Sequence, residues 1–500
     1  MNAIEEKQII KKKAAGGIAW TALYNASSRA IGLISSLVLA AILTPREFGV
    51  IGAAYLALEG CQRFSNGGVD AYLIYHKKGA KHVEDTAFQL ALIVGLSSYG
   101  LLFLGAPMIA KFFNDHNVIN VIRVMGVWLI IYSAKAVPSA ILEKKLAFKA
   151  RLTPDIIGTV VKVGLTVAFA LLGLGVWSIV AGLLISEAIT MAMLFSKANW
   201  APKNLLRLDL KTLREMLSYT KSIQLAGILG FIAMNMDYSV VGRFLGTFYL
   251  GIYTFAFNIA NLPAALITQA VSRVMFPAYS ELRRKEDIGE AFLKVTKYIA
   301  AVALPMGIGM FYTVPIFLTY TYGNKWALAI PVLQILLVLG VARAIFSGTG
   351  EVFKALGRPD VASALTFGLV AITLPSLVLF GKNNLIYVGA IMALMSLCSA
   401  AISLRMVLKL TNLPLARFIN VLKYLLLNSA ALAGLLTFVN YGGFFNLSKI
   451  AALGISILSG CLLYSVLTLL LEPESVAEIK AMLRGRLPDA RKKATTYAEA

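Results

Sequence analysis

The sequence predicts an all-α integral membrane protein with about 14 transmembrane helices, arranged as two six-helix lobes related by a repeat plus two C-terminal helices. Of its 500 residues, 58% are hydrophobic and only 14% are charged, whereas soluble domains are about 25% charged. The apolar residues also fall in blocks of the roughly 20 residues needed to cross a bilayer. A soluble enzyme with a large apolar core is the less favoured alternative, because core helices are shorter than these blocks.

Each apolar block is expected to form a helix, because a segment surrounded by lipid must satisfy its own backbone hydrogen bonds. The expected spans cover approximately 16–43, 48–74, 86–112, 118–141, 154–175, 177–196, 218–244, 250–276, 295–320, 327–353, 360–380, 384–408, 418–440 and 447–471. The segments between them are short, so no loop is expected to hold a soluble domain.

The positions of Lys and Arg support this set of spans and predict that both termini are cytoplasmic. With the N-terminus inside, the cytoplasmic segments hold 32 of the 47 Lys and Arg residues, and the outer loops and helix ends hold 6. Cytoplasmic loops of membrane proteins are enriched in these residues, so the net charge of +22 predicts no nucleic-acid partner. The basic N-terminal segment leads into an apolar block without a small-residue cleavage site, and we expect a retained first span.

An internal repeat predicts the division into lobes. Residues 43–55 read LTPREFGVIGAAY and residues 245–257 read LGTFYLGIYTFAF, at an offset of 202 positions. Parallel repeats of this kind place a substrate site between the lobes, and chance similarity of apolar segments is the alternative explanation. The expected divisions are an N-terminal lobe at 1–200, a C-terminal lobe at 201–412, two further spans within 413–471 and a cytoplasmic tail at 472–500.

Polar side chains recur at helical spacing within several spans and predict a water-filled cavity. An ionisable side chain at mid-bilayer costs about 2.5–3.5 kcal/mol on insertion scales, which makes it a functional candidate. Cations outnumber carboxylates at these depths, and Arg binds phosphate oxygens well, so we expect an anionic substrate. Hydrogen bonding between packed helices is the alternative explanation, above all for Asn. The candidate substrate-binding residues are Arg29, Arg63, Lys162, Lys135, Arg343, Asn25, Asn66, Asn258 and Asn261.

Two deep carboxylates, Asp237 and Glu187, are candidates for binding a coupling proton or sodium ion. The sequence contains no Walker A motif and no metal-ligand spacing, so we expect no cofactor, no metal and no catalytic residue. The three cysteines lie in apolar segments and form no disulfide framework.

Ordered segments across most of the chain carry a family resemblance. They include LTPREFGVIGAAY (43–55), GGVDAYLIYHKK (67–78), LGAPMIAKFF (104–113), VPSAILEKKLAFKA (137–150), LGIYTFAFNIANLP (250–263) and SRVMFPAYSEL (272–282). Together they resemble the Wzx-type polysaccharide transporters of the multidrug/oligosaccharidyl-lipid/polysaccharide (MOP) flippase superfamily, and most closely the colanic-acid and teichuronic-acid exporter branch. One departure is Glu143, at a position where an arginine is usual.

The resemblance implies two helical lobes around a central cationic cavity. It implies that the protein flips undecaprenyl-diphosphate-linked oligosaccharides from the inner to the outer leaflet of the bacterial cytoplasmic membrane by alternating access. The expected pathway makes a surface polysaccharide such as O-antigen, capsule or exopolysaccharide, and the expected partners are membrane lipids and other polysaccharide assembly proteins. One alternative is a multidrug/cation antiporter of the same superfamily, which requires an anionic cavity. A membrane glycan polymerase or ligase is less favoured, because those enzymes generally carry a large outer loop.

Overall fold

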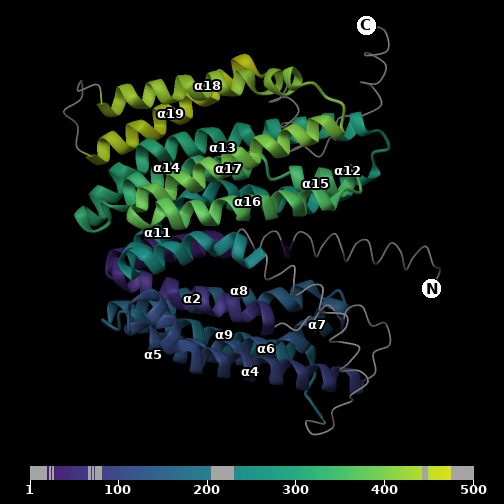
Figure 1. Ribbon diagram of the computed structural model, residues 1–500, viewed down its shortest axis with the longest axis vertical. Helices are drawn as coiled ribbons and strands as arrows, with labels where there is room; N and C mark the ends of the chain where they lie inside the picture. Colours follow the sequence, from purple (N-terminus) through teal and green to yellow (C-terminus); the bar gives the residue numbers. More distant parts are fainter. Residues whose placement is uncertain are drawn as a thin grey trace. The chain divides into compact units, whose positions relative to one another are not determined.

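The computed structural model describes residues 20–21, 24, 27–65, 69, 72–73, 81–203, 230–441 and 449–473. Helices and short turns make up this part of the chain, and none of its residues lies in a strand. Ten of its helices are long and apolar enough to cross a membrane, and the shorter helices Ser27–Ile42 and Thr247–Ala260 are also apolar. The predicted all-α membrane fold class is therefore confirmed (Figure 1).

The observed helices follow the predicted spans along the chain. The labelled α-helices are α2 (Pro45–Ser65), α4 (Lys81–Phe113), α5 (Asn117–Met125), α6 (Val127–Ala134), α7 (Ala136–Lys144), α8 (Phe148–Leu171), α9 (Val176–Ala198), α11 (Thr247–Ala260), α12 (Leu262–Glu281), α13 (Lys285–Tyr322), α14 (Ala329–Ile345), α15 (Thr349–Ala355), α16 (Pro359–Phe380), α17 (Leu385–Leu410), α18 (Leu415–Tyr441) and α19 (Lys449–Leu471). Three short elements join them: the π-helix η1 (Val241–Leu245) and the 3-10 helices η2 (Gly323–Trp326) and η3 (Gly381–Asn383). The helix Ser27–Ile42 precedes α2, and residues 230–240 are helical and lead into η1.

Three predicted spans are divided in the structure. The fourth comprises α5, α6 and α7, which meet at Gly126 and Lys135, and the eighth comprises α11 and α12, which meet at Asn261. The tenth comprises α14 and α15. Pro138 and Pro263 lie in the first turn after a break. Proline has no backbone N–H, which is no loss in the first turn of a new helix but would remove a hydrogen bond from a helix that continued unbroken. Hydrophobicity alone does not reveal such breaks, because the apolar run continues through them.

The helices pack into two compact units. Unit 1 comprises Met1–Leu266, Tyr322–Leu336 and Ser363–Ser396, and unit 2 comprises Ile267–Thr321, Leu337–Ala362 and Leu397–Ala500. In unit 1, α8 and α9 lie side by side (Figure 1) and approach closely at two glycines. A Cβ on Gly158 would lie 2.1 Å from Thr190 Oγ1, and a Cβ on Gly182 would lie 2.1 Å from Thr166 Oγ1. Such small residues allow membrane helices to pack backbone to backbone.

In unit 2, ion pairs join α13 to the C-terminal helices. Lys297 of α13 pairs with Glu472, whose side chain is 4% exposed, and Arg417 of α18 pairs with Glu290 of α13 at 3.1 Å. These pairs attach both α18 and the end of α19 to α13. Beyond residue 473, the tail predicted at 472–500 lies outside the described residues.

Candidate functional site

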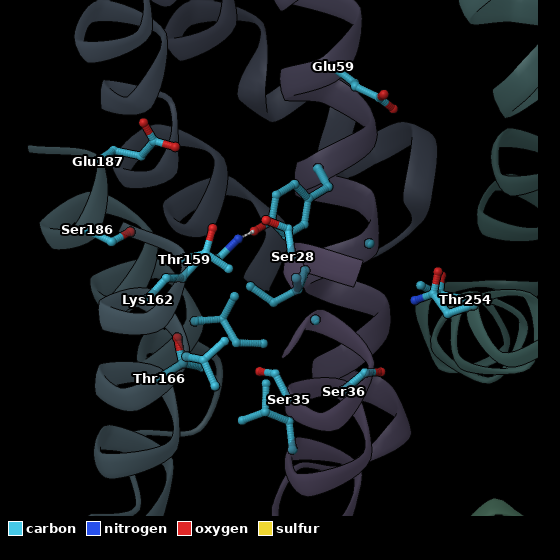
Figure 2. Close-up of a pocket in the computed structure, with 18 of the residues that line it drawn as sticks. Ser28, Ser35, Ser36, Glu59, Thr159, Lys162, Thr166, Ser186, Glu187 and Thr254 are labelled. Atoms are coloured by element: carbon cyan, nitrogen blue, oxygen red, sulfur yellow. Dashed lines mark hydrogen bonds between the residues drawn. The ribbon is translucent and has the colours of Figure 1, made fainter. Parts of the chain in front are cut away.

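Unit 1 contains a cavity of about 800 Å³, which is within the ~300–1,000 Å³ range of small-molecule pockets. Its walls come from the helix Ser27–Ile42, α2, α8, α9, α11 and residues 234–238. Figure 2 shows side chains from these helices facing the cavity. Hydroxyl groups make up most of the polar lining, on Tyr24, Ser28, Ser35, Ser36, Tyr55, Thr159, Thr166, Ser186, Thr190, Tyr238 and Thr254.

Lys162 of α8 is a cation in this lining whose partner is neutral. Its Nζ donates a hydrogen bond to Tyr55 Oη at 3.2 Å and lies 5.7 Å from the centroid of the same ring. Figure 2 shows the amine directed from its helix across the cavity, with this bond as a dashed line. Among the described residues, no carboxylate lies within ion-pair distance of Lys162. Its charge is therefore available to an anionic ligand.

The two other cations in the lining are paired with carboxylates. Lys135, at the break between α6 and α7, lies 2.5 Å from a carboxylate oxygen of Glu187, and both side chains are at most 20% exposed. Arg63 lies 3.8 Å from Glu59, one turn earlier on α2, and both side chains are more than 40% exposed. The first pair is short and largely buried, whereas the second is long and open, so Arg63 is the easier of the two to redirect toward a ligand.

The charges of the described lining balance. Its cations are Arg63, Lys135 and Lys162, and its carboxylates are Glu59, Asp155 and Glu187. Asp155 is held by Arg151, which lies outside the lining and also bonds Glu143 at 3.2 Å. The surplus of cations expected from the sequence is therefore not found among the described residues of this cavity. Lys162 therefore differs from the other two cations in having a neutral hydrogen-bond partner, and the net charge of the lining does not distinguish it.

The remaining substrate-binding candidates lie in different places. Asn258 of α11 lines the cavity and is exposed. Arg29 and Asn261 are half-buried in unit 1 and outside the lining, and Arg343 of α14 belongs to unit 2. Substrate binding by these residues stays a prediction. Two further candidates lie outside the described residues: Asn25 and Asn66.

The two coupling-ion candidates also differ in environment. Asp237 is 1% exposed, lies outside the cavity lining and accepts a hydrogen bond from Tyr253 Oη at 2.7 Å. Glu187 lines the cavity and is held by Lys135. Ion coupling by either carboxylate stays a prediction.

Three hydroxyl oxygens of the lining lack a hydrogen-bond partner within the described part of the chain. They are the buried Ser36 Oγ, Thr166 Oγ1 and Thr254 Oγ1. Buried polar atoms are nearly always hydrogen-bonded, so these three oxygens can gain a partner only when the side chains around them shift. The hydroxyl groups of the lining as a whole can donate to and accept from a cargo rich in hydroxyl groups.

Tyr55 is not among the residues that the sequence predicts for the site. It precedes Glu59 by four positions and Arg63 by eight, which places all three on one face of α2. This spacing is the sequence pattern from which Tyr55 could have been predicted to face the cavity. A tyrosine in an apolar segment is more often a packing residue, and only the position of Lys162 shows that its hydroxyl faces a charge.

A solved structure has the same fold as this chain. The lipid II flippase MurJ, in its inward closed conformation, superposes with a TM-score of 0.75 and 16% identity, over 92% of this chain and 100% of that one. Together with the apolar helices and the polar cavity, this likeness defines a multi-pass membrane protein with the fold of a lipid flippase.

The sequence comparisons give the family. Residues 38–331 match the family described as "Polysaccharide biosynthesis protein", and the chain belongs to this family. The teichuronic acid biosynthesis protein TuaB of Bacillus subtilis (strain 168) is 26% identical over 96% of this chain and 99% of its own length. The lipopolysaccharide biosynthesis protein WzxC of Escherichia coli (strain K12) is 22% identical over 75% of this chain and 76% of its own. The resemblance to Wzx-type transporters is thus confirmed.

Proposed function

We propose that this protein flips undecaprenyl-diphosphate-linked oligosaccharides from the inner to the outer leaflet of a bacterial cytoplasmic membrane, for surface polysaccharide synthesis. The relatives support this cargo class, since TuaB is named for teichuronic acid, WzxC for lipopolysaccharide and MurJ for lipid II. The observation that carries the proposal for this chain is a hydroxyl-lined cavity that holds a lysine with no carboxylate partner in the described part of the chain.

In the proposed mechanism, the chemistry of the cargo matches the groups in the cavity. Lys162 gives up its hydrogen bond to Tyr55 and receives a diphosphate oxygen, because a charge-assisted bond is stronger than a bond to a neutral phenol. Arg63 supplies a second cation by turning away from Glu59. The hydroxyl groups of the lining bind sugar hydroxyls, and the polyprenyl chain stays in lipid.

Transport of this cargo needs no covalent step. Each negative charge that leaves an inside-negative cell gains about 2.3 kcal/mol per 100 mV if it crosses the whole field. The membrane potential therefore favours export of a diphosphate. Two rearrangements remain necessary: one that admits the cargo from the cytoplasmic leaflet and one that releases it to the outer leaflet.

The test is export in cells whose own copy of the gene is deleted. Such cells should accumulate lipid-linked oligosaccharide on the cytoplasmic face, and the intact gene should restore its export. Lys162→Met removes the charge at similar length, and we expect export to fall about tenfold or more while the protein stays in the membrane. Lys162→Arg should retain much of the activity.

Lys423 provides the matched control. It is an exposed lysine of α18 in unit 2, is not one of the lining residues, and lies 4.8 Å from the ring centroid of its neighbour Tyr424. Lys423→Met should leave export unchanged. Full export by Lys162→Met would remove Lys162 from the site, whereas normal distribution of the lipid-linked oligosaccharide in the deletion strain would exclude the proposed function itself.

The multidrug/cation antiporter is the alternative within the same fold. A cavity for cationic drugs requires an excess of negative charge, but the described lining balances its carboxylates with cations. We therefore expect that deletion of the gene leaves resistance to cationic drugs unchanged.

A further inference from the structure

Two glycines bring α2 and α11 into backbone contact at one end of the cavity. A Cβ on Gly49 would lie 1.6 Å from the carbonyl oxygen of Thr247, and a Cβ on Gly251 would lie 1.8 Å from that of Pro45. No side chain fits at either position, because both nearest atoms belong to the partner backbone. We call this contact the glycine crossing; α2 and α11 lie side by side there (Figure 1).

The glycine crossing joins equivalent positions of the internal repeat. Gly251 follows Gly49 by 202 residues, and Thr247 follows Pro45 by the same 202 residues. Gly49 faces the carbonyl of Thr247, which is four residues before Gly251. In the same way, Gly251 faces the carbonyl of Pro45, which is four residues before Gly49. Reciprocal contacts of this kind arise where a two-fold axis passes between related surfaces. The contact thus lies where the pseudo-two-fold axis of the repeat passes between the two halves.

The cavity begins beside the crossing, where Phe48 of α2, next to Gly49, is part of its lining. On α2, the lining continues through Gly52, and on α11 through Thr254. A Cβ on Gly52 would lie 3.2 Å from Thr254 Oγ1, so the helices are still close at this level. Glu59 and Arg63 line the cavity further along α2, away from the crossing. The crossing therefore closes one end of the cavity.

A buried carboxylate strengthens the closure beside the crossing. Asp115, in the turn after α4, accepts a hydrogen bond from Thr247 Oγ1 at 2.7 Å, and Arg46 Nε lies 3.3 Å from the same carboxylate. Arg243 of η1 adds a second connection, since its Nη1 donates to the carbonyls of Lys111 and Phe112 at 3.2 and 3.1 Å. The bonds of Thr247 to Asp115 and of Arg243 to Lys111 and Phe112 join the two halves, whereas Arg46 holds Asp115 from within the first half.

The end of the helix Ser27–Ile42 is attached at the same level by three side chains near η2. Tyr322 Oη donates to the carbonyl of Leu37, Trp326 Nε1 donates to that of Ala40, and Lys325 Nζ donates to those of Ala40 and Ala41. The last carbonyls of a helix lack partners within it and favour a cation. The bonds from Lys325 and Trp326 therefore satisfy carbonyls of the helix end with groups about 285 residues away.

We propose that the glycine crossing, together with these hydrogen bonds, is the outer seal of the cavity and parts when cargo is released outward. The outward direction rests on the proposed function and on the predicted orientation, in which both the turn before α2 and the turn after α4 face outside. The seal combines a backbone contact that tolerates no side chain with hydrogen bonds that can break and re-form. It therefore closes tightly and still opens.

The test measures access to the cavity with a reagent that does not cross membranes. A single cysteine replaces Asn258, an exposed residue of α11 that lines the cavity, in a chain whose native cysteines are changed to serine: Cys61, Cys398 and Cys461. Intact cells are treated with a membrane-impermeant maleimide. We expect slow labelling of this chain, and labelling about tenfold faster or more once Gly49→Val or Gly251→Val wedges the crossing apart.

Gly105→Val is the matched control, because a Cβ on Gly105 of α4 meets no atom within 4 Å. It should leave the labelling rate unchanged. Equal rates for Gly49→Val and Gly105→Val would overturn the proposal, as would faster labelling seen only in inverted vesicles. The readout involves no cargo, so a negative result here leaves the proposed function standing.

A reversible lock covers the case in which a wedged variant fails to fold. The side chains of Asp115 and Thr247 touch at 2.7 Å, so cysteines at both positions are within reach of a disulfide after small adjustment. Oxidation should hold the seal shut and stop export, and a reducing agent should restore export to the level before oxidation. Export that continues after the disulfide has formed would overturn the proposal.

Discussion

At the scale of single residues, the partner of a charge decides its role. Lys162 faces a neutral phenol in an open cavity, and its charge is available for a ligand. Asp115 is 3% exposed and is surrounded by donors, so its charge is used within the protein. The position of a residue in or near a predicted span does not distinguish these two roles, because both residues are ionisable groups next to or within apolar segments.

Asp115 is expected to make stability depend on pH. Burial alone would raise the pKa of this carboxyl, but hydrogen bonds from Thr247, Arg46 and the Asn117 amide hold the pKa below its ordinary value. A carboxyl with a lowered folded pKa stabilises the protein above its unfolded pKa of about 3.9 and loses this effect as pH falls through the folded pKa. Between about pH 5 and about pH 3, the Tm of the purified wild type should therefore fall more than that of Asp115→Asn. Equal falls would mean that Asp115 does not titrate with folding.

At the scale of helices, local sequence signals predict some boundaries and miss others. The start of α2 follows a capping box, in which the Glu47 amide donates to Thr44 Oγ1 at 3.3 Å and the Thr44 amide donates to Glu47 Oε2 at 2.7 Å. Pro45 occupies the first helical position, where proline is favoured. The break at Lys135 has a weaker signal, Pro138 three residues later, and the residues next to the break are apolar.

The packing of α8 on α9 gives a prediction for this scale. Gly158→Ala would place a Cβ 2.1 Å from Thr190 Oγ1, and overpacking of this kind costs about 1–3 kcal/mol. We expect a lower Tm of the purified protein, with partial recovery when Thr190→Ala is added. Gly164→Ala is the matched control on the same helix, because its Cβ would meet no atom within 4 Å. Equal Tm values for Gly158→Ala and Gly164→Ala would contradict the close contact between α8 and α9 at Gly158.

At the scale of the whole molecule, the sequence predicts far more of the fold than of the site. The spans follow from length and hydrophobicity, because lipid leaves a segment few alternatives to a helix. The cavity depends on which faces of distant helices meet, and one sequence does not contain that information. The candidates chosen from the polar stripes include Lys162, which lines the cavity, but the stripes gave no sign that Arg29 would lie outside the lining or that Lys135 would bind Glu187.

Orientation in the membrane is the property of the whole molecule on which the direction of transport depends. Before α16 the chain carries Lys354, in the last turn of α15, and Arg358, and after α16 the connection through η3 carries Lys382. Because α16 is one apolar helix, these segments lie on opposite sides, and the charge rule places the first inside. A phosphatase that requires disulfides is active only in an oxidising compartment. It should be inactive when fused after Arg358 and active when fused after Lys382. The reverse pattern would place the glycine crossing at the cytoplasmic face and would turn the proposed outer seal into an inner one.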